Sequence, residues 1–289
     1  MNIDLTEGML RTGRLSVHHL RVGPPTKAPR VLLLGSANFD LRYKRSFLNT
    51  ELIKHFDIAT FEPRGIGRTE QPAGAWAMAD YALDALAVMD ALGWEDACVI
   101  GESFGGMTAL HLASMVPDRV RAMVIASATA GGPKHRSYDI SKFLDLPRHE
   151  AATEAMCLQD TRNRDLQSAA PTEFEAKLAE RVAFEIAFAD PSITNGGYAR
   201  LLNARGDHDV TAQLKTITPH TTIISGAYDN QADPHSQRAI ATSLPNAEFH
   251  MFEAGHDVLF TTPGAVSLTI DVLKAANAKG SLVTGEQTT

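Results

Sequence analysis

The stretch Ala97-Cys98-Val99-Ile100-Gly101-Glu102-Ser103-Phe104-Gly105-Gly106 decides the fold of this 289-residue chain. It begins with apolar residues, as expected of a strand that is buried on both faces of a parallel sheet. The residues that follow match Gly-x-Ser-x-Gly, and a helical pattern rich in Ala and Leu continues to residue 115. A strand, a sharp turn and a helix in this order raise the central hydroxyl above the carboxyl edge of a sheet, where a base can reach it. We therefore predict that Ser103 is a nucleophile.

Buried strands and amphipathic helices alternate on both sides of this motif. Further strands are predicted at residues 30–35, 57–61, 120–126, 221–225 and 248–252. Helices are predicted at residues 47–55, 78–92, 106–115, 237–243 and 263–276. This alternation implies right-handed crossovers and an α/β fold with a doubly wound, mostly parallel sheet. Residues 14–22 alternate weakly and predict an antiparallel strand at one edge of that sheet.

One long segment breaks the alternation. Residues 133–203 show helix after helix and no convincing strand, so we predict a helical cap inserted into the chain. The core is then formed by residues 1–132 and 204–277, while the small, polar residues 278–289 are expected to be a flexible tail. A cap over the serine implies a small or medium-sized substrate enclosed away from water.

The composition is that of an ordinary globular protein and argues against several classes. Hydrophobic residues make up 44% and charged residues 21% of the chain, which excludes disorder and fibrous repeats. The net charge of −7, with scattered basic residues, argues against nucleic acid as a partner. No secretory signal is visible, and no apolar run approaches the roughly 20 residues of a membrane span. We expect a cytoplasmic monomer or homodimer that binds no membrane.

The two cysteines, Cys98 and Cys157, are too far apart in the sequence to form a Cys-x-x-Cys pair. Zinc and redox chemistry therefore have no support in the sequence. We expect neither a metal nor a cofactor.

A serine hydroxyl needs a base, which a third group must orient. Of the 11 histidines, His256 lies just past the last predicted strand, at the sheet edge where Ser103 is also expected. Asp229 follows the strand that ends at residue 225 and is the predicted acid. Asp233 shares that loop but precedes Pro234, so it is better placed to start the next helix. Asp257 is adjacent to His256, and consecutive side chains diverge too far for this contact.

The developing oxyanion also needs hydrogen-bond donors. One is expected to be the backbone N–H of Phe104, because the start of a helix has free N–H groups and favours negative charge. The second is expected in the loop after the first central strand, where the N–H of Ser36 is our first choice and that of Ala37 the second. A plain turn is the alternative interpretation for Ser36.

Taken together, these segments resemble an α/β-hydrolase-fold serine hydrolase over nearly the whole chain outside the cap. The resemblance is carried by Leu33-Leu34-Gly35-Ser36, Glu62-Pro63-Arg64-Gly65-Ile66-Gly67-Arg68-Thr69, Gly101-Glu102-Ser103-Phe104-Gly105-Gly106, Gly226-Ala227-Tyr228-Asp229 and Gly255-His256. Within that fold the chain is similar to the branch of 3-oxoadipate enol-lactonase-like hydrolases and small-molecule esterases. It departs from the family pattern at Leu34, where His is common, and at Glu62, where Asp is common.

The resemblance implies a cofactor-independent serine hydrolase that cleaves a carboxylic ester or lactone of a small organic molecule. Its relatives among the haloalkane dehalogenases and epoxide hydrolases use a carboxylate nucleophile, which Ser103 excludes. Serine favours an acyl-enzyme route, with water activated by His256 in the second half. Two alternatives remain open: hydrolysis of a carbon–carbon bond in a vinylogous diketone, and a ligand-binding protein without turnover.

Overall fold

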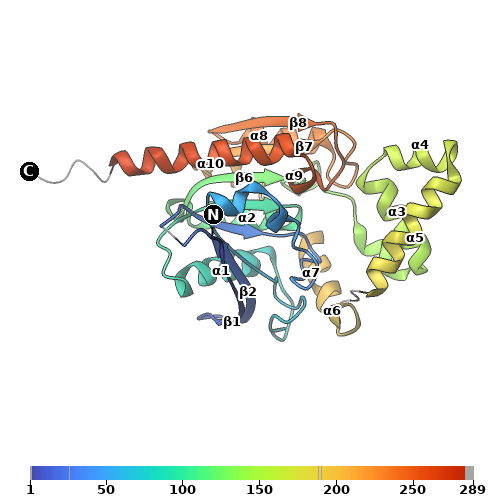
Figure 1. The fold of residues 1–289 in the computed structure, drawn as a ribbon, viewed down its shortest axis with the longest axis horizontal. Helices are drawn as coiled ribbons and strands as arrows, with labels where there is room; N and C mark the ends of the chain where they lie inside the picture. The colour runs from blue at the N-terminus through green and yellow to red at the C-terminus, as the bar shows by residue number, and fades with distance from the viewer. Residues whose placement is uncertain (1, 26, 188, 190, 284–289) are drawn as a thin grey trace, which may run out of the picture.

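A single mixed sheet organises the protein. The computed structural model describes residues 2–25, 27–187, 189 and 191–283, and the sheet has eight strands in the order β1-β2-β4-β3-β5-β6-β7-β8 (Figure 1). The pairs β1–β2 and β2–β4 are antiparallel, and every later pair is parallel. The strands are β1 Asp4–Arg11, β2 Ser16–Gly23, β3 Arg30–Leu34, β4 Asp57–Phe61, β5 Ala97–Glu102, β6 Val120–Ala126, β7 His220–Gly226 and β8 Ala247–Phe252. The predicted α/β class with a doubly wound, mostly parallel sheet is confirmed.

Helices cover both faces of the sheet, so the central strands are buried on both sides. Leu32 and Leu34 of β3 pack in one apolar cluster, and the alternate residues Val31 and Leu33 pack in another on the opposite face. The first cluster includes residues of α1 Met78–Ala91, α2 Phe104–Met115 and α8 Pro234–Ser243. The second includes residues of α9 Val258–Thr261 and α10 Pro263–Val283. Within the described ranges, none of the helices is both long and apolar enough to span a bilayer.

The segment between β6 and β7 forms a separate lobe beside the carboxyl edge of the sheet (Figure 1). The lobe consists of α3 Arg148–Gln159, α4 Arg162–Ala169 and α5 Pro171–Ala187. It has a small apolar cluster of its own, which includes Met156, Phe174 and Leu178. The chain returns through α6 Pro191–Thr194 and α7 Gly197–Gly206. Because Leu201 and Leu202 of α7 lie in the main core, the boundary expected at residue 203 falls inside a helix that packs on that core.

Two predicted elements differ from the structure. Residues 47–55 do not form one α-helix but two short 3₁₀ helices, η1 Ser46–Asn49 and η2 Glu51–Lys54. Thr50 separates them because its backbone is extended, with φ −104° and ψ 162°. The helix α10 also continues to Val283, beyond the expected start of a tail at residue 278. Residues 274–279, at the start of this extension, are rich in Ala and Lys, which are good helix formers. Residues 284–289 of that expected tail lie outside the described residues.

Glycine is required where β5 turns into α2. A Cβ atom on Gly101 would lie 2.7 Å from the carbonyl oxygen of Gly105. A Cβ atom on Gly105 would lie 1.9 Å from the carbonyl oxygen of Leu34 and 2.7 Å from that of Gly35. The start of α2 and the end of β3 therefore meet backbone to backbone, and no larger residue fits between them.

We expect Gly105→Ala to lower the free energy of unfolding by about 1–3 kcal/mol, because the added methyl group overlaps main-chain atoms that cannot move independently. Urea unfolding measures the effect as a lower transition midpoint with an unchanged slope. Gly206→Ala is the matched control, because a Cβ atom there meets nothing within 4 Å. This control should unfold at the wild-type midpoint or slightly above it. Equal midpoints for the two variants would contradict the packing argument.

Candidate active site

Ser103 occupies the sharp turn between β5 and α2. Its backbone has φ 55° and ψ −115°, a conformation that L-residues rarely adopt. The strain is held by hydrogen bonds on both sides: the Ser103 N–H donates to the carbonyl of Ala126 at 2.8 Å, and the Ser103 carbonyl accepts from Gly106 N–H at 2.9 Å. The side chain is 5% exposed. This turn therefore presents the hydroxyl at the carboxyl edge of the sheet, as the sequence predicts.

His256 lies in the loop between β8 and α9, with its ring against Ser103. The distance from His256 Nε2 to Ser103 Oγ is 2.9 Å, although 153 residues separate the two in the sequence. The backbone of His256 is fixed as well, because its carbonyl accepts a 2.5 Å hydrogen bond from the Ser127 hydroxyl. Ser127 directly follows β6 and also has a positive φ, 53°. The ring is thus held within proton-transfer distance of the serine.

Asp229 approaches the other ring nitrogen from the loop after β7. Its Oδ2 lies 2.9 Å from His256 Nδ1, and the residue is 2% exposed. Its Oδ1 accepts hydrogen bonds from the N–H groups of Gln231 at 2.9 Å and Ala232 at 3.0 Å. Asp233, the alternative acid, instead caps α8, where its side chain accepts from Ser236 N–H. The structure therefore brings together Ser103, His256 and Asp229, the three residues selected from the sequence.

The charges around the ring set its protonation. Burial lowers the pKa of His256, but the charge and hydrogen bond of Asp229 outweigh it, so the pKa is raised above its usual 6.5. Asp257 and Glu102 contribute in the same direction. Glu102 itself is affected by burial and by Asp257, which raise its pKa to about 7. Because Asp229 accepts from Nδ1–H, the neutral ring presents a lone pair at Nε2, the atom that faces the serine.

A family model for the alpha/beta hydrolase fold matches residues 33–263. The chain belongs to the α/β-hydrolase family. The match begins in β3 and includes all three residues of the Ser103–His256–Asp229 group. It confirms the family that the sequence resembles.

Proteins that are similar to this chain have names that refer to different substrates. A candidate carbamate hydrolase, RutD, of Caulobacter segnis is 30% identical over 225 residues, which cover 73% of this chain and 79% of that protein. A 2-hydroxymuconate semialdehyde hydrolase of Pseudomonas putida is 27% identical over 208 residues, 66% of this chain and 67% of that one. The enol-lactonase of Burkholderia xenovorans LB400 shares the fold, with a TM-score of 0.75, 23% identity and coverage of 92% of this chain and 100% of its own.

The oxyanion donors expected in this α/β hydrolase lie in two segments that the structure places side by side. Phe104 is the first residue of α2, so its N–H has no partner within the helix. Ser36 follows β3, whose last carbonyls lie against Gly105 at the start of the same helix. The Ser36 carbonyl accepts from Phe39 N–H at 3.0 Å, which folds this loop into a tight turn. The assignment of Ser36 and Phe104 as donors remains a prediction supported by this proximity.

The lobe of this hydrolase contributes backbone contacts that the sequence did not reveal. At the end of α3, the carbonyl of Gln159 accepts the His256 N–H at 2.7 Å, and the carbonyl of Leu158 accepts the Asn230 N–H at 3.0 Å. The N–H of Thr161 donates to the carbonyl of Tyr228 at 3.0 Å. The corner between α3 and α4 therefore fixes the loops of both His256 and Asp229. Backbone contacts of this kind leave no residue-type signal in a sequence.

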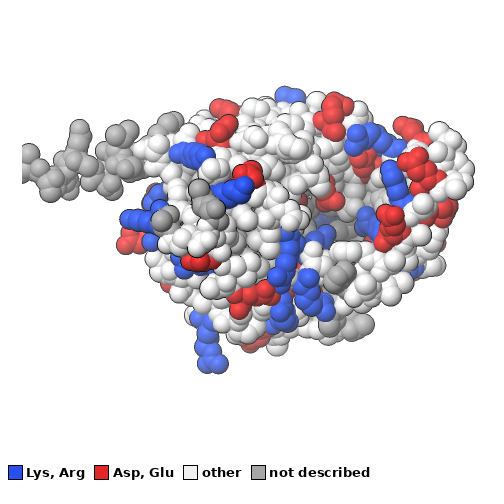
Figure 2. Space-filling model, in the orientation of Figure 1, with Lys and Arg blue, Asp and Glu red and all other residues white. Residues whose placement is uncertain are grey.

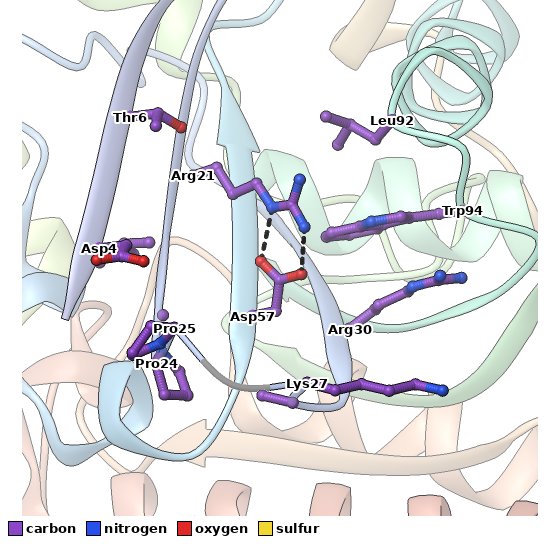
Figure 3. A pocket seen from close by; sticks show the side chains of 13 residues that line it. Asp4, Thr6, Arg21, Pro24, Pro25, Lys27, Arg30, Asp57, Leu92 and Trp94 are labelled. Carbon is purple, nitrogen blue, oxygen red and sulfur yellow. Dashed lines mark hydrogen bonds and ion pairs between the residues drawn. The ribbon is translucent and has the colours of Figure 1, made fainter. Parts of the chain in front are cut away.

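A pocket of about 450 Å³ lies at the other end of the sheet and is not part of this site. Its lining includes Arg30, the first residue of β3, and Asp57, the first residue of β4. The Arg21 guanidinium donates to both oxygens of Asp57, at 2.8 and 2.6 Å (Figure 3). Ser103 instead follows the carboxyl end of β5, where ligands of parallel α/β sheets bind. On that side the surface is hollowed between the main body and the lobe (Figure 2).

We expect the rate at which a fluorophosphonate labels Ser103 to fall as the pH is lowered, with a midpoint above 6.5. The reason is that the raised pKa of His256 leaves the ring protonated, and unable to accept the serine proton, below that midpoint. Mass spectrometry of the labelled peptide measures the rate at each pH.

Asp229→Asn should slow this labelling by roughly 10³–10⁴-fold and move the midpoint to lower pH. The shift follows because the carboxylate that raises the pKa is lost while the burial that lowers it remains. Asp233→Asn is the matched control in the same loop, since asparagine also caps helices, and it should keep the wild-type midpoint. An unchanged midpoint in Asp229→Asn would refute this account of the pKa.

Proposed function

We propose that the protein is a serine hydrolase that cleaves a carboxylic ester or lactone of a small organic molecule through an acyl-enzyme. The observation that carries the proposal is the unbroken contact series from Ser103 Oγ to His256 Nε2 and from His256 Nδ1 to Asp229 Oδ2, each at 2.9 Å. Three loops that follow three different strands meet at these atoms. This is the arrangement that converts an unreactive hydroxyl into a nucleophile.

The proposed acylation step uses all three residues. His256 Nε2 takes the Ser103 proton as Oγ attacks the carbonyl carbon, and the buried Asp229 carboxylate stabilises the imidazolium that forms. The negative charge that develops on the carbonyl oxygen is placed near the N-terminus of α2, where the N–H of Phe104 and the helix dipole favour it. His256 then returns its proton to the leaving oxygen, which breaks the acyl–oxygen bond.

Deacylation repeats these steps with water. His256 Nε2 accepts a proton from the water molecule that attacks the acyl-enzyme, and gives it to Ser103 Oγ as the acid product leaves. In a lactone the leaving oxygen stays attached to the acyl group, so the product is one hydroxy or keto acid rather than an acid and an alcohol. The same residues serve both substrates.

The lobe supports a small, partly apolar substrate. Its described residues include exposed apolar side chains, with Phe184 46% and Ile186 58% exposed. The Phe184 ring packs edge-on against Tyr43 in the segment after β3, with 5.6 Å between the ring centroids. The lobe thus contacts the main body close to the loop that carries Ser36. We propose that it acts as a lid that encloses the substrate above Ser103.

Carbamate hydrolysis is the second candidate, and the 30% identity to a candidate carbamate hydrolase favours it. A carbamate presents the same electrophilic carbonyl, so acylation and deacylation would use the same atoms. Carbon–carbon bond hydrolysis, the alternative left open by the sequence, would require protonation of a carbon rather than an oxygen leaving group. Ester, carbamate and carbon–carbon bond hydrolysis would use the same site, so a comparison of substrates is needed to distinguish them.

We expect the wild type to hydrolyse a short-chain p-nitrophenyl ester and Ser103→Ala to lose at least about a thousandfold in kcat/KM. A panel that also contains a lactone, an aryl carbamate and a vinylogous diketone ranks the candidate substrates by kcat/KM. Ser114→Ala, in the same helix as the Ser103 turn, is the matched control and should retain wild-type rates. Equal ester hydrolysis by wild type and Ser103→Ala would refute the proposal.

A further inference from the structure

A second polar side chain faces the reacting nitrogen of His256. The carboxamide nitrogen of Gln231 lies 2.9 Å from His256 Nε2, the same distance as Ser103 Oγ. Gln231 is 5% exposed, so this contact is made away from bulk water. The sequence gives no reason to select this residue, because it is one of several polar residues in the loop after Asp229.

The direction of this hydrogen bond follows from the opposite side of the ring. His256 Nδ1 donates its proton to Asp229 Oδ2, so Nε2 of the neutral ring has a lone pair and no hydrogen. A lone pair requires a donor, and the NH₂ group of Gln231 faces it. Ser103 Oγ must donate to the same lone pair for proton transfer to occur. Two donors therefore share one acceptor in the resting site.

The backbone of Gln231 is fixed on both sides, which holds the carboxamide in place. Its N–H donates to Asp229 Oδ1 at 2.9 Å, and its carbonyl accepts from Tyr138 N–H at 2.9 Å. The Tyr138 carbonyl in turn accepts from the Arg205 guanidinium at 2.9 Å, and Arg205 also donates to the Ser137 hydroxyl at 2.8 Å. Arg205 is 6% exposed. This series of buried contacts connects α7 to the loop that carries Gln231.

We propose that Gln231 is a positioning residue for His256. Its carboxamide donates to Nε2, holds the ring in the orientation that faces Ser103 and competes with the serine for the Nε2 lone pair. This inference rests on the proposed function, because it assigns Gln231 a role in the same proton transfer. After Ser103 is acylated it can no longer donate, and Gln231 is then the protein donor that keeps the ring aligned for the attacking water.

A hydrogen-bond donor at Nε2 affects the pKa of His256 in a defined direction. The charged groups that act on the ring are Asp229 from the loop after β7, Glu102 from the end of β5 and Asp257 beside the ring, and all three favour the imidazolium. Lys44 acts on Glu102. A donor at Nε2 stabilises the neutral ring and opposes them. Removal of that donor should therefore raise the pKa of His256.

The test compares Gln231→Met, which keeps the side-chain length but has no donor, with Gln231→Glu, which places a carboxylate at Nε2. The rate at which a fluorophosphonate labels Ser103 is measured as a function of pH. The midpoint of this pH profile should rise by about 0.5–1 pH unit in Gln231→Met and further in Gln231→Glu. Ester hydrolysis by Gln231→Met should show kcat reduced several-fold with KM within about twofold of wild type. Asn230→Ala changes the exposed neighbour in the same loop and should leave all of these values unchanged.

A midpoint in Gln231→Met within 0.2 unit of the wild type would overturn the proposal, whatever the change in kcat. The midpoint is compared only for variants whose thermal unfolding shows a folded protein, and Gln231→Glu provides the test if Gln231→Met does not fold. If the wild type is not labelled, the proposed function fails. In that case the pKa of His256 is measured from the pH dependence of its ring ¹⁵N chemical shifts. These signals are assigned by their absence in His256→Asn. The proposal then requires the pKa of His256 to be higher in the Gln231 variants than in the wild type.

Discussion

The close packing of Gly105 against the main chain of Leu34 and Gly35 is the constraint on which the site depends. It brings the start of α2 directly against the end of β3, which leaves Ser103 only a strained conformation with φ 55°. The hydroxyl is then displayed at the sheet edge, while the free N–H groups of α2 lie beside the loop after β3. One contact between glycine and a carbonyl thus positions both the nucleophile and the expected oxyanion donors.

The lobe is part of this arrangement rather than only a cover. The carbonyls of Leu158 and Gln159 accept N–H groups from the loops of Asp229 and His256, so the end of α3 is attached to both. A lid that moved as one rigid body would break these bonds and disturb the Asp229–His256 pair. Opening for substrate is therefore compatible with an intact site only if α3 stays in place and the movement is confined to elements such as α5. The exposed apolar residues of α5 are placed for that role.

The sequence was sufficient to predict the parallel sheet, the strand-turn-helix at Ser103 and the three residues that the structure brings together. These depend on local signals: apolar runs, glycines at fixed spacing, and polar residues directly after strands, which must meet at one sheet edge. It did not predict the split at Thr50, the edge strand β1 Asp4–Arg11 or the role of Gln231. The position of Gln231 depends on a contact between distant segments, because Tyr138 fixes the Gln231 carbonyl, and a single sequence does not record such contacts. The split at Thr50 instead involves local bonds, in which the N–H and the hydroxyl of Thr50 both donate to the Phe47 carbonyl.

The environment of His256 balances opposing influences on one proton. Asp229, Asp257 and Glu102 favour the imidazolium, while burial favours the neutral ring. A nucleophilic serine needs the neutral ring before each attack and the charged ring after it, so an environment that strongly favours either state would slow one half of the cycle. A neutral donor such as Gln231 adjusts this balance without adding a charge to the site, and its backbone hydrogen bond to Asp229 Oδ1 ties its position to that of the carboxylate it opposes.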